Sequence, residues 1–523
     1  MTDEERYPPS YESAELRRFR AEQLPGQQAL RARACEFHRH HTASSACVPS
    51  RASLFTGHYP TLHGVRATDG AAKAAHDPNM FWLDPNTVPT MGHYFRAAGY
   101  RTHYRGKWHV SHADLVTPDT RAPIASSDDE GVVIGANTAL YRAAERLALH
   151  GFHGWVGPDP HGAARANCGK LRDPIFADQV DDLIGSLEVS ADTSPWLAVA
   201  SFVNPHDIVL FGALWAAWGE AFADETVPEV PEPPTQDESL RDKPSCQADY
   251  VKKYGKIFVP QPQIPMYRRF YYYLHKLVDR QVARVLQRLA ASRFCDDTIV
   301  VYTSDHGEML GAHGGMHQKW HNAYDETLRV PLLIAGPGIA AGRVDHLSSH
   351  VDLLPTLLGL AGLDAEALRA ELARGHSEAQ PLVGRDLSGL ARGGAASDEP
   401  VYFMSEDEVS EGLDQTTILG RKYEAVEEPA KVEAVLARVD LGTGTRLWKY
   451  ARAYRRSLVG DPAEASGWPE RCEYELYDLE ADPHETHNLA HGLGDRDTRA
   501  AREQMEALLE VTRAKKALHP RLR

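Results

Sequence analysis

Several short segments of this chain carry residue types that can act chemically on an anion. The segment ACVPSRASLFTGH contains Cys47 four positions before Arg51. The apolar residues that follow predict a helix that starts after Pro49, with the cysteine at its amino terminus. A thiol in that position, next to a guanidinium, would have a lowered pKa and would be reactive. The alternative is an ordinary buried structural cysteine.

Two further segments place charged groups where strands end. In GYRTHYRGKWH, Lys107 and His109 stand two positions apart and would point to the same side of an extended chain. In TIVVYTSDHG, an apolar strand delivers Asp305 and His306 at its carboxyl end. Open α/β sheets bind their ligands at that edge. A carboxylate and an imidazole there could hold a divalent cation, although Asp305 could also simply cap the following turn.

The composition excludes several classes of protein. The 523 residues include 57 Lys and Arg against 73 Asp and Glu, a net charge of −16, which argues against nucleic-acid binding. An acidic chain that binds an anion must build a local cationic pocket. No apolar run approaches the roughly 18 residues of a membrane-spanning helix, and the amino terminus has no apolar signal core. We therefore expect no membrane partner and a cytoplasmic location. The chain has six cysteines and no CxxC pair, so it is not a disulfide scaffold. This cysteine usage favours a reducing compartment.

Unbroken apolar strands are expected at 195–204, 298–304 and 330–335, with a long helix at 267–292. Such strands are typical of a parallel sheet covered by helices on both faces. We expect a large, mostly parallel α/β domain over 1–375 and a linker at 376–399. A smaller α+β domain over 400–523 should follow, with strands at PVYFMS, TRLWKYARAY and EYELYDL and a closing helix near 500–518.

The pattern C-x-P-S-R-x-x-x-x-T-G, which begins at Cys47, resembles the signature of the sulfatase family. GYRTHYRGKWH is similar to the second signature of that family, except that Arg105 replaces a small apolar residue. The segments FVNPHD, HQKWHNAYDETLRVPLLI and ELYDLEADPHETHNLA also resemble sulfatase elements. The resemblance covers almost the whole chain and implies the alkaline phosphatase-like fold.

This resemblance implies hydrolysis of a small-molecule sulfate monoester to an alcohol and inorganic sulfate. A separate formylglycine-generating enzyme would oxidise Cys47 to formylglycine, whose aldehyde hydrates to a geminal diol. One hydroxyl, held by Arg51 and Lys107, would attack sulfur while His206 or Lys319 protonates the leaving alcohol. Deprotonation of the second hydroxyl would then expel sulfate.

The resemblance also assigns the remaining site residues. His109 would be the base that deprotonates the second hydroxyl. One divalent cation would bind, Ca²⁺ by preference for an oxygen-rich site, with Mg²⁺ or Mn²⁺ as alternatives. Its ligands would be Asp3, Glu4, Cys47, Asp305 and His306.

Two other functions are compatible with the same residues. Relatives with a formylglycine pocket and a metal-binding histidine hydrolyse phosphonate or phosphate mono- and diesters, and rates on an aryl sulfate and a phosphonate monoester would separate the two activities. A sulfatase-like binding protein without activity is the non-enzymatic alternative. The complete Cys47 signature argues against it.

The beginning of the chain yields a geometric expectation. Sulfatases open with an apolar strand that ends in paired acids, whereas this chain opens with MTDEER. We expect Asp3 to be a metal ligand on a free end that lacks its strand, with Glu4 in the second acidic place. The Asp3 carboxylate should lie roughly 4–5 Å from that of Asp305. A late start codon would explain the missing strand, in which case the DNA upstream of Met1 would encode apolar residues in frame.

Overall fold

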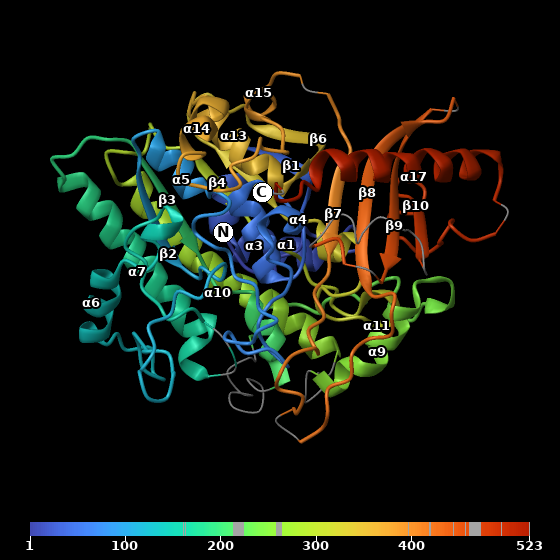
Figure 1. Cartoon of the computed structure of the whole chain (residues 1–523), viewed down its shortest axis with the longest axis horizontal. Helices are drawn as coiled ribbons and strands as arrows, with labels where there is room; N and C mark the ends of the chain where they lie inside the picture. The colour runs from blue at the N-terminus through green and yellow to red at the C-terminus, as the bar shows by residue number, and fades with distance from the viewer. Residues whose placement is uncertain are drawn as a thin grey trace.

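The computed structural model describes residues 1–160, 162, 164–212, 224–257, 264–395, 397–417, 420–442, 444–455, 457–459, 472–492 and 494–521. A larger α/β part and an antiparallel sheet lie side by side, with the chain's amino terminus near the centre of the molecule (Figure 1). No helix in the described ranges is both long enough and apolar enough to cross a bilayer.

The larger part is built on two sets of strands. Four strands lie in the order β4 (Val300–Thr303), β5 (Leu332–Ala335), β1 (Ala34–His41) and β6 (Gly342–Ser349). Beside them, β2 (Arg101–Gly106) pairs in parallel with β3 (Trp196–Ser201). β1 and β6 are parallel, but β5 is antiparallel to both of its neighbours. The expected α/β class is confirmed, with β5 running against the parallel direction.

The first residues of the chain join these two sets. The N–H of Phe202 donates to the Met1 carbonyl at 2.9 Å, and the N–H of Thr2 donates to the Thr303 carbonyl at 3.0 Å. Thr2 and Asp3 form parallel bridges with Ser304 and Pro205, respectively. The expectation that Asp3 hangs from a free end is therefore wrong, because backbone pairing on both sides holds this segment between β3 and β4.

Helices cover both faces of the sheet, as the unbroken apolar strands predict. On β5, Leu332 and Ile334 pack with α3 (Cys47–Thr56), α5 (Met91–Ala97) and α13 (Leu353–Leu360). The alternate residues Leu333 and Ala335 pack against α2 (Pro25–Arg31), α7 (Gly169–Val189) and α10 (Ile264–Ala290). Successive side chains of a strand point to opposite faces, so β5 contributes to two cores. Shorter helices are α1 (Ala14–Gln23), α4 (Pro60–His63), α6 (Gly135–Ala144), α9 (Ser245–Ile257), α11 (Ala312–Gly315), α12 (Asp325–Leu328) and α14 (Ala365–Leu372).

The second sheet is antiparallel, in the order β10 (Glu473–Asp478), β9 (Thr445–Tyr454), β8 (Lys431–Asp440) and β7 (Val401–Ser405). The helix α17 (Arg496–Lys516) lies across one face of it (Figure 1). Three of these strands were expected and β8 was not. The short helix α15 (Ser388–Ala391) lies within the expected linker.

Candidate active site

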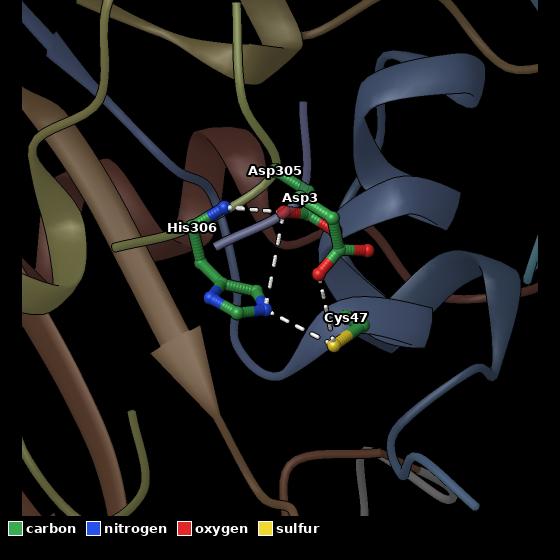
Figure 2. Close-up of side chains that lie close together, drawn as sticks. All are labelled: Asp3, Cys47, Asp305 and His306. Carbon is green, nitrogen blue, oxygen red and sulfur yellow. Dashed lines mark hydrogen bonds and ion pairs between the residues drawn. The ribbon is translucent and has the colours of Figure 1, made fainter. Parts of the chain in front are cut away.

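Cys47 is the first residue of α3, which ends at Gly57 in the left-handed conformation (φ 70°). The expectation that this helix starts after Pro49 is wrong by three residues, because the helix begins at Cys47 and not at Ser50. Proline is tolerated in the first turn of a helix because the N–H groups of that turn have no intrahelical acceptor, so the N–H that proline lacks is not needed. The helix is buried along its whole length. It holds the Cys47 Sγ atom 3.1 Å from His306 Nε2 and 3.9 Å from Asp3 Oδ1 (Figure 2).

Two separate segments, one with Asp3 and one with Asp305 and His306, bring acids and an imidazole around this sulfur. One ligand atom each from Asp3, Cys47, Asp305 and His306 lies within 4.8 Å of the others (Figure 2). The expected approach of the Asp3 and Asp305 carboxylates is therefore observed. His306 is oriented by its Nδ1, which lies 2.9 Å from the Gly307 carbonyl, so Nε2 faces the cluster.

Arg51 holds the two aspartates in place. Its Nη2 donates to Asp3 Oδ2 at 2.7 Å, and its Nε donates to Asp305 Oδ2 at 2.8 Å. The guanidinium also donates from Nη1 to the Lys107 carbonyl at 2.9 Å. All three charged side chains are buried, and such charges require partners of opposite sign. Arg51 therefore fixes the carboxylates on the sulfur side of α3.

Lys107 reinforces the charge on Asp3. Its Nζ lies 2.9 Å from Asp3 Oδ2, with both side chains buried. Burial alone would raise the pKa of Asp3, but Lys107 and Arg51 outweigh it and hold that pKa well below its usual range. Asp3 is thus an anion in the folded protein, as a metal ligand must be.

Glu4 occupies the second acidic position and pairs with Lys319, whose Nζ lies 3.0 Å from Glu4 Oε2. Gln318 Oε1 accepts a second hydrogen bond from the same Nζ at 3.1 Å. Burial raises the pKa of Glu4 well above its usual range, and Lys319 only partly offsets this. The Oε1 atom of Glu4 is buried and has no hydrogen-bond partner among the described residues. A buried carboxylate oxygen of this kind is a natural place for a cation.

His206 completes a second possible ligand group with Asp3 and Glu4, again with ligand atoms within 4.8 Å. Partial burial and the positive charge of Lys107 lower the pKa of His206 well below its usual range. The imidazole is therefore neutral before an anion binds. The structure thus brings Lys107 and His206 to Asp3, and Lys319 to the adjacent Glu4.

His109 is held differently. Its Nε2 lies 2.6 Å from Asp69 Oδ1, and no contact between His109 and Cys47 is found in the described part of the chain. The backbone around it is fixed by Asp159, whose carboxylate accepts from the N–H of Trp108 at 2.7 Å and of His109 at 2.9 Å. Neither aspartate was predicted from the sequence, because each stands alone in a loop without a motif.

The thiol of Cys47 is not activated in the way its place in the sequence suggested. Burial, and next the Asp3 carboxylate, raise its pKa to about 12, although Lys319 and Lys107 act in the opposite direction. The prediction of a lowered thiol pKa is wrong because burial and the neighbouring acids outweigh the helix terminus and nearby cations. The unmodified thiol is protonated at neutral pH and is a poor nucleophile.

The donor set fits a hard divalent cation. In one ligand group, Asp3 and Asp305 offer carboxylate oxygens and His306 offers a nitrogen; in the other, Glu4 and His206 join Asp3. Such a set is oxygen-rich, as Ca²⁺ and Mg²⁺ prefer, and the imidazole also suits transition metals.

Comparison with known proteins agrees with this geometry. The family model described as Sulfatase matches residues 1–363, which include Asp3, Cys47, Asp305 and Lys319. The chain belongs to the sulfatase family. The chain is 29% identical over 355 residues to "Choline-sulfatase" of Rhizobium meliloti (strain 1021). That alignment covers 66% of the chain and 64% of the relative, which is less than two thirds of the relative's length.

Solved structures match this chain over nearly its full length. A structure described as a 2-O GAG sulfatase aligns with a TM-score of 0.62 and 22% identity, and covers 99% of this chain and 91% of its own. A phosphonate monoester hydrolase from Silicibacter pomeroyi aligns with a TM-score of 0.62 and 20% identity, and covers 99% and 94%. At these identities the likeness establishes the alkaline phosphatase-like fold.

Proposed function

We propose that this sulfatase hydrolyses a small-molecule sulfate monoester to an alcohol and inorganic sulfate, with a nucleophile derived from Cys47. The observation that carries the proposal is the convergence on one sulfur atom: Cys47 Sγ lies 3.1 Å from His306 Nε2 and 3.9 Å from Asp3 Oδ1. Lys107 pairs with Asp3 at 2.9 Å, and Lys319 pairs with the adjacent Glu4 at 3.0 Å. These cations form the local positive site that an acidic chain needs for an anionic substrate.

The nucleophile we propose is formylglycine, made from Cys47 by a separate maturation enzyme. Formylglycine supplies a hydrated aldehyde with one hydroxyl for attack on sulfur and a second whose deprotonation expels sulfate. The raised pKa of the Cys47 thiol, about 12, supports this assignment because the unmodified side chain lacks nucleophilic character at neutral pH.

A divalent cation, Ca²⁺ by preference with Mg²⁺ or Mn²⁺ as alternatives, would be held by Asp3, Glu4, Asp305 and His306 together with the modified Cys47 side chain. When bound, it would supply charge stabilisation for the transferring group and for the attacking oxygen. Arg51 holds the carboxylates of Asp3 and Asp305 toward that position, through contacts of 2.7 and 2.8 Å.

The remaining residues bind the sulfate group and move protons. Lys107 and Lys319 contribute positive charge to the substrate oxygens, where charge-assisted hydrogen bonds are strong. His206 is neutral in the free protein, and a bound sulfate anion would favour its protonated form, so that it or Lys319 could protonate the leaving oxygen. His109, held by Asp69 at 2.6 Å, would take the proton of the second hydroxyl.

A second candidate activity is hydrolysis of phosphonate or phosphate mono- and diesters. The observation that favours it is the imidazole of His306 in the ligand group. The test is a panel of aryl sulfate, phosphonate monoester and phosphate mono- and diester substrates, assayed with protein produced together with a formylglycine-generating enzyme. The proposal predicts the highest kcat/KM on the sulfate ester. A higher value on the phosphonate would favour the alternative, and no turnover of any ester by metal-loaded, modified protein would favour a binding protein.

A further inference from the structure

A buried carboxylate, that of Asp407, contacts two segments of the α/β part that are far apart in the sequence. Asp407 stands two positions after the end of β7, and its side chain is buried. Its Oδ2 accepts a hydrogen bond from Trp320 Nε1 at 2.9 Å, and its Oδ1 lies 3.5 Å from Lys73 Nζ. A buried carboxylate requires polar partners of this kind. Asp407 therefore joins the segments of Trp320 and Lys73 through one side chain.

The contact with Trp320 leads to Lys319. Lys319 Nζ lies 4.8 Å from the centroid of the Trp320 ring, within the distance of a cation–π contact, and 3.0 Å from Glu4 Oε2. Because the indole N–H donates to Asp407, the orientation of the ring is fixed. The fixed ring presents its negative face, and not its positive edge, to the ammonium group. Asp407 thus helps to determine where the charge of Lys319 lies.

The contact with Lys73 leads to His109. Lys73 closes a tight turn with Gly70, in which the N–H of each residue donates to the carbonyl of the other at 2.7 Å. Asp69 immediately precedes this turn, and its Oδ1 lies 2.6 Å from His109 Nε2. The residue that holds the imidazole is therefore next to a turn whose last residue pairs with Asp407.

We propose that Asp407 is a positioning residue for two groups of the active site, Lys319 and His109. It acts on the first through Trp320 and on the second through Lys73. This inference rests on the proposed function, in which Lys319 faces the substrate oxygens and His109 takes the proton of the second hydroxyl. One carboxylate outside the signature segments then aligns a group that acts when the ester is cleaved with a group that acts when sulfate is expelled.

The two contacts can be removed separately. Trp320→Phe keeps an aromatic ring beside Lys319 but loses the N–H that donates to Asp407, and Lys73→Met loses the ammonium group at nearly constant length. Asp407→Leu removes both contacts. Asp407→Asn keeps an oxygen acceptor for the indole but loses the negative charge that faces Lys73.

Asp478→Leu is the matched control. Asp478 ends β10 of the same antiparallel sheet, is also buried, and accepts hydrogen bonds from the backbone N–H groups of Glu480 and Ala481, each at 3.1 Å. Its loss should lower the Tm and leave the kinetics of the folded protein unchanged.

Steady-state kinetics on the ester with the highest turnover separate the two contacts, because kcat/KM covers the steps up to departure of the alcohol and kcat also covers expulsion of sulfate. We expect Trp320→Phe to lower kcat/KM about tenfold, and Lys73→Met to lower kcat about tenfold with kcat/KM nearly unchanged. Asp407→Leu should lower both, and Asp407→Asn should restore kcat/KM toward the wild-type value. Adding Trp320→Phe to Asp407→Leu should lower kcat/KM no further, because both changes remove one contact.

Binding of inorganic sulfate to unmodified protein in calcium-containing buffer gives a readout that does not need turnover. We expect Asp407→Leu and Trp320→Phe to raise the Kd for sulfate about tenfold, and Lys73→Met and the control to leave it unchanged. Wild-type protein that neither binds sulfate nor turns over any ester would contradict the proposed function, and this inference with it.

Other outcomes would contradict the role of Asp407 alone. One is folded Asp407→Leu protein whose kcat, kcat/KM and sulfate affinity equal those of an active wild type. Another is an equal loss of activity in Asp407→Leu and Asp478→Leu, which would indicate a general loss of packing. If Asp407→Leu does not fold, Trp320→Phe and Lys73→Met decide the question, and wild-type kinetics in both would overturn the proposal.

Discussion

At the scale of single residues, the site depends on ion pairs whose members are buried and therefore need a partner of opposite charge. Arg51 and Lys107 pair with Asp3, and Arg51 also pairs with Asp305. Lys319 pairs with Glu4, and all six side chains are buried. Removing one member leaves its partner as a buried, uncompensated charge, which costs more than the pair itself contributes. Binding and stability should therefore change together when this network is altered.

Lys319 provides the clearest single-residue prediction. The change Lys319→Met keeps the length of the side chain but removes the charge that faces Glu4 and the proposed sulfate position. We expect kcat/KM on the preferred ester to fall about ten- to a hundredfold, as for loss of a charge-assisted hydrogen bond. The matched control is Lys253→Met, because Lys253 pairs with Asp249 on the surface of α9 and should leave kcat/KM unchanged. Equal activity of Lys319→Met and wild type would remove Lys319 from the site.

The residues of the motifs could be predicted from the sequence, but those that support them could not. Cys47, Arg51, Lys107 and Asp305 were found from their spacing, and the structure brings all four together. Asp69 lies 40 positions before His109 in the sequence, and Asp159 lies 50 positions after it. Nothing local marks such residues, because folding alone brings them to their partners.

At the scale of elements, three of the site residues lie at or just beyond the end of a regular segment. Asp305 follows β4, Lys107 follows β2, and Cys47 begins α3. Strand character was predictable where apolar runs were unbroken, as in β3 and β4. It was not predictable for β8, KVEAVLARVD, which is rich in residues that also favour helices and becomes a strand through pairing with β7 and β9. The antiparallel direction of β5 could not be predicted either, because composition does not encode strand direction.

The junction between β2 and Lys107 should tolerate no side chain. Gly106 has φ of 101°, and a Cβ there would lie 1.8 Å from the Ser201 carbonyl oxygen of the neighbouring strand. We expect Gly106→Ala to lower the free energy of unfolding by more than about 3 kcal/mol, measured by denaturant titration.

The matched control for this junction is Gly99→Ala. Gly99 also has a positive φ, 84°, but a Cβ there would meet nothing within 4 Å. We expect Gly99→Ala to lower the free energy of unfolding by only about 1–2 kcal/mol, because a residue with a Cβ is strained in the left-handed conformation. Similar losses for the two variants would show that the close approach of β3 is not what requires Gly106.

At the scale of the whole molecule, the second sheet supports the active site. One face of it packs under α17, and the other contributes Phe403 and Leu436 to a core shared with Trp320, the neighbour of Lys319. Trp320 Nε1 also donates to Asp407 Oδ2 at 2.9 Å, and Ser45 Oγ donates to Ser405 Oγ at 3.1 Å. The end of β7 and the residues just after it therefore hold the segment before Cys47 and the segment that contains Lys319.

A second link between distant segments predicts a pH dependence of stability. His313 Nδ1 lies 2.8 Å from Glu238 Oε1, and its Nε2 lies 3.6 Å from Glu326 Oε2. Burial opposes the charge, but the two glutamates outweigh it and raise the pKa of His313 to about 9. A folded-state pKa above the unfolded value of about 6.5 means that this stabilisation is complete below pH 6.5 and is lost as pH rises through about 9.

The measurement is the Tm from pH 6 to 10 for wild type and His313→Gln. We expect the difference between the two proteins to be largest near pH 6 and to shrink as pH rises through about 9, because only wild type loses a charged imidazole. A difference that is constant across this range would show that His313 is not held in its charged form.

The most direct test of the proposed mechanism is peptide mass spectrometry at Cys47 across protein batches that differ in exposure to the formylglycine-generating enzyme, with sulfate release from an aryl sulfate measured on each batch. The account predicts that turnover rises in proportion to the fraction of formylglycine at this position and is absent in Cys47→Ala protein that remains folded. Full turnover by protein whose Cys47 is an unmodified thiol would contradict it.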